Sequence, residues 1–63
     1  MKTVEELRSE FEKIKNIKER IKRAKLSFED DMDEYHTKSI KNCDVYDEMY
    51  VNGAWLMFQR LNK

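Results

Sequence analysis

The chain has 63 residues, of which 41% are charged, with equal numbers of acidic and basic side chains, one cysteine, one glycine and no proline. A chain of this length makes a single domain (1–63) and buries only roughly 60% of the surface that its unfolded form exposes, so its core is marginal. The lone Cys43 excludes an intramolecular disulfide and fits a reducing, cytoplasmic compartment. The chain contains neither an apolar run approaching the ~20 residues that cross a bilayer nor a secretory signal at its start, so we expect no membrane partner.

A helical pattern of apolar residues runs through the first half of the chain. These residues recur every three or four positions from Val4 to Tyr35, among residues that form helices readily. Thr3 and Glu6 have the spacing of a capping box, in which the hydroxyl and the carboxylate satisfy free backbone N–H groups. The pattern therefore predicts one long first helix over about 3–37.

Two features mark where this helix is interrupted or ends. Ser27 and Asp30 repeat the capping-box spacing inside the pattern, which leaves open a break near residues 25–27 and a three-helix chain. The stretch from His36 to Cys43 is polar and has no clear period. We expect the frayed end of the first helix and a connecting loop there.

A second helix is predicted over about 44–62. Asp44 is a good N-cap, with Asp47 three residues later, and apolar residues continue at helical spacing behind it. The obstacle is Asn52-Gly53, because glycine costs about 1 kcal/mol relative to alanine within a helix. The alternative interpretation is that Asn52 caps a shorter helix that begins at Gly53.

These two elements predict an all-α fold, an antiparallel helical hairpin joined by a short loop. With the loop centred near residue 41, the apolar faces of the two helices meet over part of their length. The predicted core of the hairpin consists of Phe28, Met32, Tyr35, Tyr46, Tyr50, Ala54, Trp55, Phe58 and Leu61.

The first half of the long helix has no counterpart in the second helix. Burying a large apolar side chain is worth about 1.5–3 kcal/mol, so leaving this row exposed would be costly. We expect a homodimer in which the two overhanging segments meet in a four-helix bundle. The alternatives are a monomer with a folded-back or disordered N-terminus, or a complex with another protein. The predicted dimer or partner interface is Val4, Leu7, Phe11, Ile14, Ile17 and Ile21.

Residues capable of catalysis or metal binding are few. His36 and Cys43 are the strong nitrogen and sulfur ligands, whereas a structural zinc site needs four ligands and a catalytic one three. The acidic stretch from Asp31 lacks the glycine and the final glutamate of a calcium-binding loop. We therefore predict no catalytic residue, no metal, no cofactor and no small-molecule substrate.

Basic residues crowd the segment from Lys13 to Lys25 and suggest an alternative role in binding nucleic acid. Isoleucines interrupt this segment in core phase, and an acidic block follows it, so we regard DNA or RNA binding as the less favoured hypothesis. The possible nucleic-acid contacts are Lys15, Lys18, Lys22, Arg23 and Lys25.

The segment Tyr50–Gln59 contains a box that reads as tyrosine, a short polar step, Ala-Trp, two variable residues, an aromatic residue and Gln. This box resembles one near the C-terminus of small accessory proteins from the early, recombination-to-excision region of lambda-like tailed phages. Phe11-Glu12 could correspond to a Phe-Glu pair that such proteins carry in an N-terminal helix, whereas Phe58 stands where tryptophan is usual.

The resemblance implies a bacteriophage protein made early in infection, without enzymatic activity, in the cytoplasm of the host cell. It also implies that the protein modulates host physiology or the lysis–lysogeny choice by binding an unidentified host protein. We therefore predict a protein–protein interaction module. The rival hypotheses are the nucleic-acid-binding regulator and one component of an antitoxin-like pair.

Overall fold

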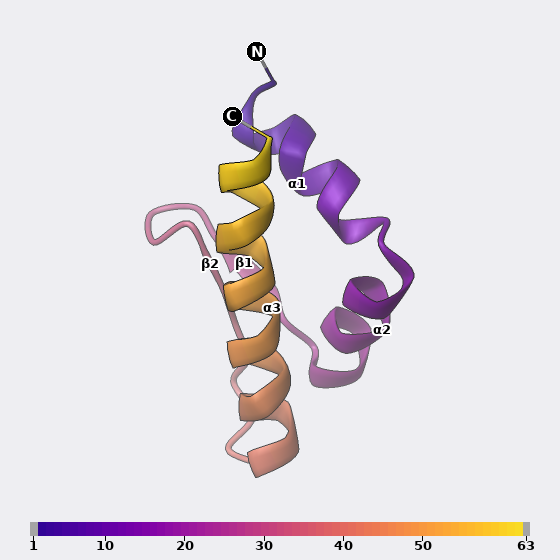
Figure 1. Cartoon of the computed structure of the whole chain (residues 1–63). Helices are drawn as coiled ribbons and strands as arrows, with labels where there is room; N and C mark the ends of the chain where they lie inside the picture. Colours follow the sequence, from indigo (N-terminus) through magenta and orange to yellow (C-terminus); the bar gives the residue numbers. More distant parts are fainter. Residues whose placement is uncertain (1, 63) are drawn as a thin grey trace.

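The computed structural model describes residues 2–62 and consists of three helices and a two-stranded antiparallel sheet (Figure 1). The elements follow in the order α1 (Val4–Glu12), α2 (Lys15–Ala24), β1 (Ser27–Glu29), β2 (Glu34–His36) and α3 (Asn42–Leu61). The predicted all-α helical hairpin is therefore wrong, because the fold is a mixed α+β arrangement. In Figure 1, α3 stands in front, with the β-hairpin on one side of it and α1 and α2 on the other.

The first of these helices begins where the capping box predicts. The Thr3 hydroxyl accepts a hydrogen bond from the backbone N–H of Glu6 at 3.2 Å and lies 3.2 Å from its carboxylate. The helix then ends at Glu12, and Ile14 takes an extended conformation (φ −63°, ψ 123°) before α2 begins. The predicted helix over 3–37 is thus broken after about two and a half turns.

A second break ends α2. Lys25 has a left-handed conformation (φ 54°), and the N–H of Leu26 bonds to the carbonyl of Ile21 at 3.0 Å, as in a Schellman motif. A break near residues 25–27 was the alternative to a continuous helix, but a strand follows it where a helix was expected.

The length of α3 explains why the long helix does not form. A straight helix over 3–37 would be about 50 Å long, whereas the 20 residues of α3 span about 30 Å. Breaks at Ile14 and Lys25 let Phe11 and Ile17 join one core, and each such burial is worth about 1.5–3 kcal/mol. Ile14, at the first break, is left 44% exposed.

The two strands are only three residues each and pair with Phe28 opposite Tyr35. The turn between them contains Asp33 in the left-handed region (φ 53°). Because a lone two-stranded hairpin is marginally stable in water, it needs a packing partner, and contacts with α3 provide one.

The last helix, α3, is continuous through Asn52-Gly53, so the alternative of a shorter helix from Gly53 is wrong. It begins two residues before the predicted cap, and Asp44 lies in its first turn. Asp47, three residues after the predicted cap, is buried against α2.

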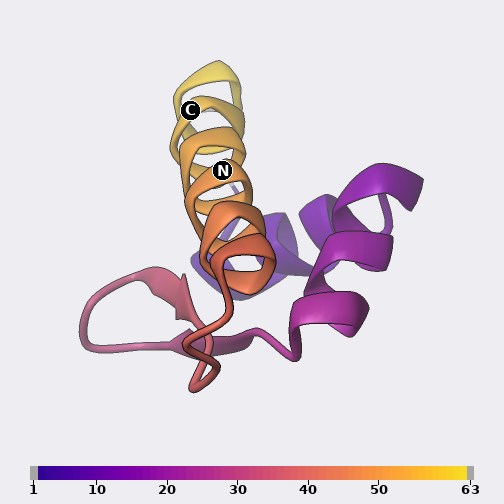
Figure 2. The same ribbon diagram turned by 90° about the horizontal axis from the view of Figure 1, so that it is seen from below.

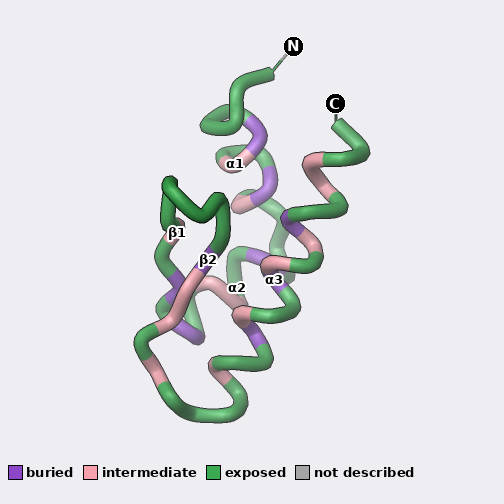
Figure 3. The backbone as a smooth tube through the Cα atoms, turned by 90° about the vertical axis from the view of Figure 1, so that its left-hand side faces the viewer, coloured by how far each residue is buried: buried purple, intermediate pink, exposed green. Residues whose placement is uncertain are grey.

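The core is built around Trp55. Its ring lies 5.1 Å from Phe11 in α1, 5.9 Å from Phe28 in β1 and 6.2 Å from Tyr35 in β2, measured between ring centroids. Figure 3 shows that buried residues alternate with exposed ones along α3. The buried apolar residues are Leu7, Phe11, Ile17, Ala24, Leu26, Tyr35, Val51 and Trp55.

The predicted core is therefore right only in part. Tyr35 and Trp55 are buried, and Phe28, Ala54 and Phe58 pack against the core while partly exposed. The other four predicted core residues are exposed at the surface, namely Met32, Tyr46, Tyr50 and Leu61.

The molecule is too thin to cover α3 on both sides. Its Cα atoms extend 37 × 25 × 15 Å, and the shortest dimension holds about two layers of elements, since packed helix axes lie roughly 8–10 Å apart. Seen from below, the hairpin and the other helices lie beside and behind α3, and the side of α3 that faces the viewer in Figure 1 is bare (Figure 2). One face of α3 thus remains in solvent.

Replacing Phe11 by alanine should remove the contact between α1 and the aromatic core. The expected loss is about 3–5 kcal/mol of unfolding free energy, a large share of the stability of so small a domain. Urea denaturation followed by circular dichroism measures it. Met32→Ala is the control, since Met32 is 55% exposed and should change stability by less than about 0.5 kcal/mol. Equal losses from the two variants would contradict the assignment of Phe11 to the core.

Candidate interaction surface

The residues predicted to bind a partner do not form one surface. Leu7, Phe11 and Ile17 are buried in the chain's own core, and Ile21 packs partly buried against it. Val4 and Ile14 are the two that stay exposed. The overhang on which this prediction depended does not exist, because the break between α1 and α2 folds the segment onto α3.

A different apolar surface lies on α3. Its members recur at three- and four-residue intervals and are all exposed, so they line one side of the helix. We call it the α3 outer face, and it consists of Tyr46, Met49, Tyr50, Gly53, Leu56, Met57 and Leu61. Tyr46 and Leu61 are 75% and 79% exposed. Sequence reasoning placed Tyr46, Tyr50 and Leu61 inside the protein, because α3 has apolar residues on both sides and periodicity does not say which side is buried.

The hairpin is held by polar side chains on another side of α3. Asn52 accepts a hydrogen bond from the Tyr35 N–H at 2.7 Å and donates one to the Tyr35 carbonyl at 2.8 Å. The amide thus pairs with β2 as a neighbouring strand would. Glu48, one turn earlier, accepts from the Thr37 N–H at 2.7 Å. Glu48 and Asn52 were not identified from the sequence. The available signal was that they lie four residues apart, each directly after a buried residue, Asp47 or Val51.

A buried carboxylate joins α2 to α3. Asp47 is 3% exposed and accepts hydrogen bonds from Arg20 at 2.8 Å and from Arg23 at 2.9 and 3.0 Å. The hydrogen bonds from Arg23 and its charge lower the pKa of Asp47, outweighing the opposing effect of burial, and Arg20 adds to the effect. Because both guanidinium groups donate to this carboxylate, Asp47 serves the structure and is not available as a general base.

Two further contacts extend this junction. The Arg20 guanidinium lies 3.8 Å above the centre of the Tyr50 ring, and Asn16 donates to the Tyr50 hydroxyl at 3.1 Å. In the core, the Tyr35 hydroxyl donates to Glu12 at 2.8 Å, and burial followed by this hydrogen bond raises the pKa of Tyr35. The hydroxyl groups of Tyr50 and Tyr35 are thus hydrogen-bonded to neighbouring side chains, which is a structural role.

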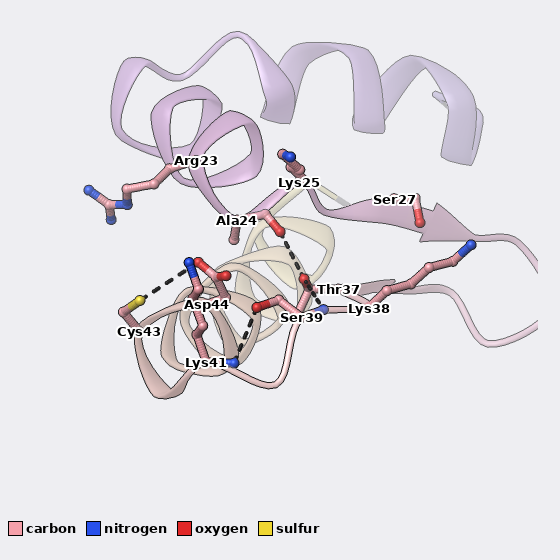
Figure 4. A pocket seen from close by; sticks show the side chains of 10 residues that line it. All are labelled: Arg23, Ala24, Lys25, Ser27, Thr37, Lys38, Ser39, Lys41, Cys43 and Asp44. Carbon is pink, nitrogen blue, oxygen red and sulfur yellow. Dashed lines mark hydrogen bonds between the residues drawn. The ribbon is translucent and has the colours of Figure 1, made fainter.

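A cavity of about 560 Å³ lies between the end of α2 and the start of α3 (Figure 4). Several polar groups that line it are already hydrogen-bonded to each other. The Thr37 hydroxyl donates to the Ala24 carbonyl at 2.8 Å, and the N–H of Lys41 donates to the Ser39 hydroxyl at 3.2 Å. The side chains of Arg23 and Lys38 extend away from each other in Figure 4. Cys43 is exposed, with Asp44 as its polar neighbour at 3.8 Å. This arrangement does not converge on a point where a ligand would be held.

The basic residues proposed to contact nucleic acid lie along α2 and just after it. Lys15, Lys18, Lys22 and Lys25 are exposed, and none of them forms an ion pair with another residue between 2 and 62. Arg23 differs, because it bonds to Asp47. Four of the five predicted nucleic-acid contacts therefore lie along α2 or just after it, exposed at the surface.

His36 lies apart from these surfaces, with Glu34 and Glu48 each at 3.6 Å from its ring nitrogens. Among residues 2–62, histidine, cysteine and carboxylate side chains do not gather in the groups of three or more that could hold a metal ion.

In the same part of the chain, none of the helices has the length and apolar character needed to span a membrane. No family model, curated protein or solved structure matches the chain.

The bonds to Asp47 predict a loss of stability in acid. Because the folded protein keeps Asp47 ionised at lower pH than the unfolded chain does, this contribution is present at neutral pH and disappears as the pH falls below about 4. Urea unfolding between about pH 7 and pH 2 should show a smaller acid-dependent loss in Asp47→Asn than in the wild type. Asp31→Asn, a change at an exposed position, serves as the control. Parallel pH profiles for wild type and Asp47→Asn would contradict the role assigned to this carboxylate.

Proposed function

We propose that the protein is a non-enzymatic protein–protein interaction module of the cytoplasm and that it docks through the α3 outer face. One observation carries the proposal. Six large apolar side chains, each between 46% and 79% exposed, lie together along a helix of 20 residues. Contiguous apolar patches of this kind mark binding sites on small soluble proteins.

The composition of this face supports the same conclusion. A helix that is apolar on both sides is normally buried on both sides, but the chain covers one side of α3. Arg60 is the single charged residue between Tyr46 and Leu61 on the bare side. Methionine and tyrosine, which supply four of the six large side chains, are enriched at the centres of protein interfaces. Methionine also adapts its shape to different partners.

The resemblance of Tyr50–Gln59 to small phage accessory proteins suggests the class of partner. It implies a host protein, bound early in infection, through which host physiology or the lysis–lysogeny choice is modulated. In the fold, Trp55 of this box lies in the core, and Gln59 bonds to Asp33 of the hairpin turn. Met57 and Leu56, between these two, are on the outer face and available to a partner.

Photo-cross-linking in cells tests the docking surface. A photoreactive amino acid in place of Met57 should form covalent adducts with other polypeptides, because Met57 lies on this face and is 54% exposed. The same amino acid in place of Ile40, which is 94% exposed but lies outside the face, is the matched control. Adducts are read by mass after denaturing electrophoresis.

A second substitution makes the result specific. Met49→Lys should reduce the adducts at position 57, while changing the stability of the chain by less than about 0.5 kcal/mol at low concentration, because Met49 is 66% exposed. Adducts at position 40 that equal those at position 57 would contradict the proposal.

Nucleic-acid binding is a second candidate, favoured by the row of lysines on α2. Lys15, Lys18 and Lys22 recur at three- and four-residue intervals, so they project from one side of the helix toward solvent. Such a row can neutralise several phosphates. Against it stands the acidic hairpin turn, which includes Asp30 and Asp31 and would repel a long nucleic acid that reached it.

Fluorescence anisotropy with labelled duplex DNA and single-stranded RNA tests this candidate. Binding by these lysines should weaken steeply as salt rises and fall at least about tenfold in Lys18→Glu/Lys22→Glu. Lys38→Glu, outside the row, is the control. Absence of binding at about 150 mM salt would remove the candidate.

A further inference from the structure

We infer that the occupant of the α3 outer face is a second copy of this chain, whose α3 crosses the first antiparallel at Gly53. The inference rests on the proposed function: for the same docking surface it names a second copy as the occupant, in place of the host protein that the resemblance implies. The first observation is Gly53 itself. A Cβ atom built on this residue would meet nothing within 4 Å, so the chain's own packing does not require glycine there.

The position of Gly53 indicates what the empty space beside it serves. It lies in the middle of the outer face, between Tyr46 and Leu61, within a continuous helix. A glycine within a helix lowers stability by about 1 kcal/mol relative to alanine. It also lets a second helix approach closely, because it has no side chain. A helix crossing at this residue uses that space.

The outer face is complementary to itself when the second helix runs antiparallel. Met49 and Met57 lie four residues on either side of Gly53, so a two-fold axis through the glycine places Met49 of one chain beside Met57 of the other. Tyr46 and Arg60 lie seven residues on either side and also face each other. Apolar residues thus meet apolar residues throughout this pairing, apart from Arg60.

Charge selects the antiparallel direction. Arg60 is the charged residue beside the outer face, and an antiparallel pair places its guanidinium near the ring of a tyrosine, a favourable cation–π contact. A parallel pair would instead bring the two copies of Arg60 together and align the helix dipoles unfavourably.

The exposed area suits a weak dimer. Tyr46 and Tyr50, 75% and 46% exposed, leave roughly 240 Å² uncovered if a buried aromatic side chain accounts for about 200 Å². The four aliphatic side chains raise the total to on the order of 600 Å² per copy, against about 800 Å² per partner in a standard interface. A groove of about 300 Å³ beside Tyr50 and Met57 gives the second copy further surface to fill.

Sedimentation equilibrium of the whole chain, from about 5 µM to about 500 µM, tests the inference. The wild type should pass from monomer to dimer mass, with a dissociation constant of tens of micromolar, as expected for an interface at the small end of the range. Gly53→Leu should weaken the dimer at least about tenfold, since leucine blocks the close crossing. Ile40→Lys, outside the face, should dimerise as the wild type does.

The same leucine should have the opposite effect on the monomer. At low concentration, Gly53→Leu should raise the melting temperature by about 4–8 °C, because leucine favours helix and its Cβ atom would meet nothing within 4 Å. A purely structural role for Gly53 would not produce a more stable monomer that fails to dimerise. If Gly53→Leu dimerises as tightly as the wild type, the crossing at Gly53 is wrong.

Disulfide cross-linking tests the direction. In a Cys43→Ser background, chains carrying Met49→Cys and chains carrying Met57→Cys are mixed and oxidised. The antiparallel pair predicts that the mixed disulfide exceeds either disulfide between identical chains, and the reverse result would overturn it. A wild type that stays monomeric at the highest concentration overturns the second-copy inference. If the chain stays monomeric, adducts to other proteins at position 57 would still support the proposed function. The absence of such adducts would then contradict the proposed function as well as the second-copy inference.

Discussion

The fold depends on the packing of Trp55 against one aromatic ring from each of α1, β1 and β2. Phe11 comes from α1, Phe28 from β1 and Tyr35 from β2, and all three centroids lie within 6.2 Å of the indole. A 63-residue chain has few large side chains with which to exclude water, so these elements must converge on one point of α3. The broken path of the first half of the chain follows from that requirement. The buried Asp47 then fixes α2 to the same helix through two arginines.

Concentrating the core on one side of α3 leaves the other side uncovered, and this is the physical link between the fold and the proposed function. A molecule whose Cα atoms span 15 Å in the thinnest direction has no third layer to place over Tyr46, Met49 and Met57. Glu48 and Asn52 occupy the side of the helix that holds the hairpin, so the three roles of α3 are separated around its circumference. One helix thus organises the core, completes the hydrogen bonds of β2 and exposes an apolar surface to solvent.

Part of this could be predicted from the sequence, because some signals are local. The cap at Thr3 is confirmed, and a second helix near 44–62 is present as α3, since capping and helical periodicity depend on neighbouring residues. The break at Ile14 has no such signal, because neither proline nor glycine is there. The spacing of Ser27 and Asp30 left a break near residues 25–27 open, but nothing local predicts that a lysine takes the left-handed conformation there. Phe28 and Tyr35 are spaced as on a helix, yet they form strands because Asn52 and Trp55 hold them, and those contacts exist only in the folded chain. The prediction of Tyr46, Tyr50 and Leu61 as core residues is wrong for the same reason, since periodicity reveals an apolar side of α3 but not which side the rest of the chain covers.

The central claim is that α3 folds the chain with one side and binds another chain with the other. Isotope-filtered nuclear Overhauser measurements on a mixture of labelled and unlabelled protein test it most directly, because they detect contacts between chains and ignore those within one. The account predicts contacts between chains that join the methyl groups of Met49 and Met57, and none that involve Phe11 or Val51, which are buried inside each copy. Intermolecular contacts arising from Val4 and Ile14, with none from Met49 or Met57, would contradict it.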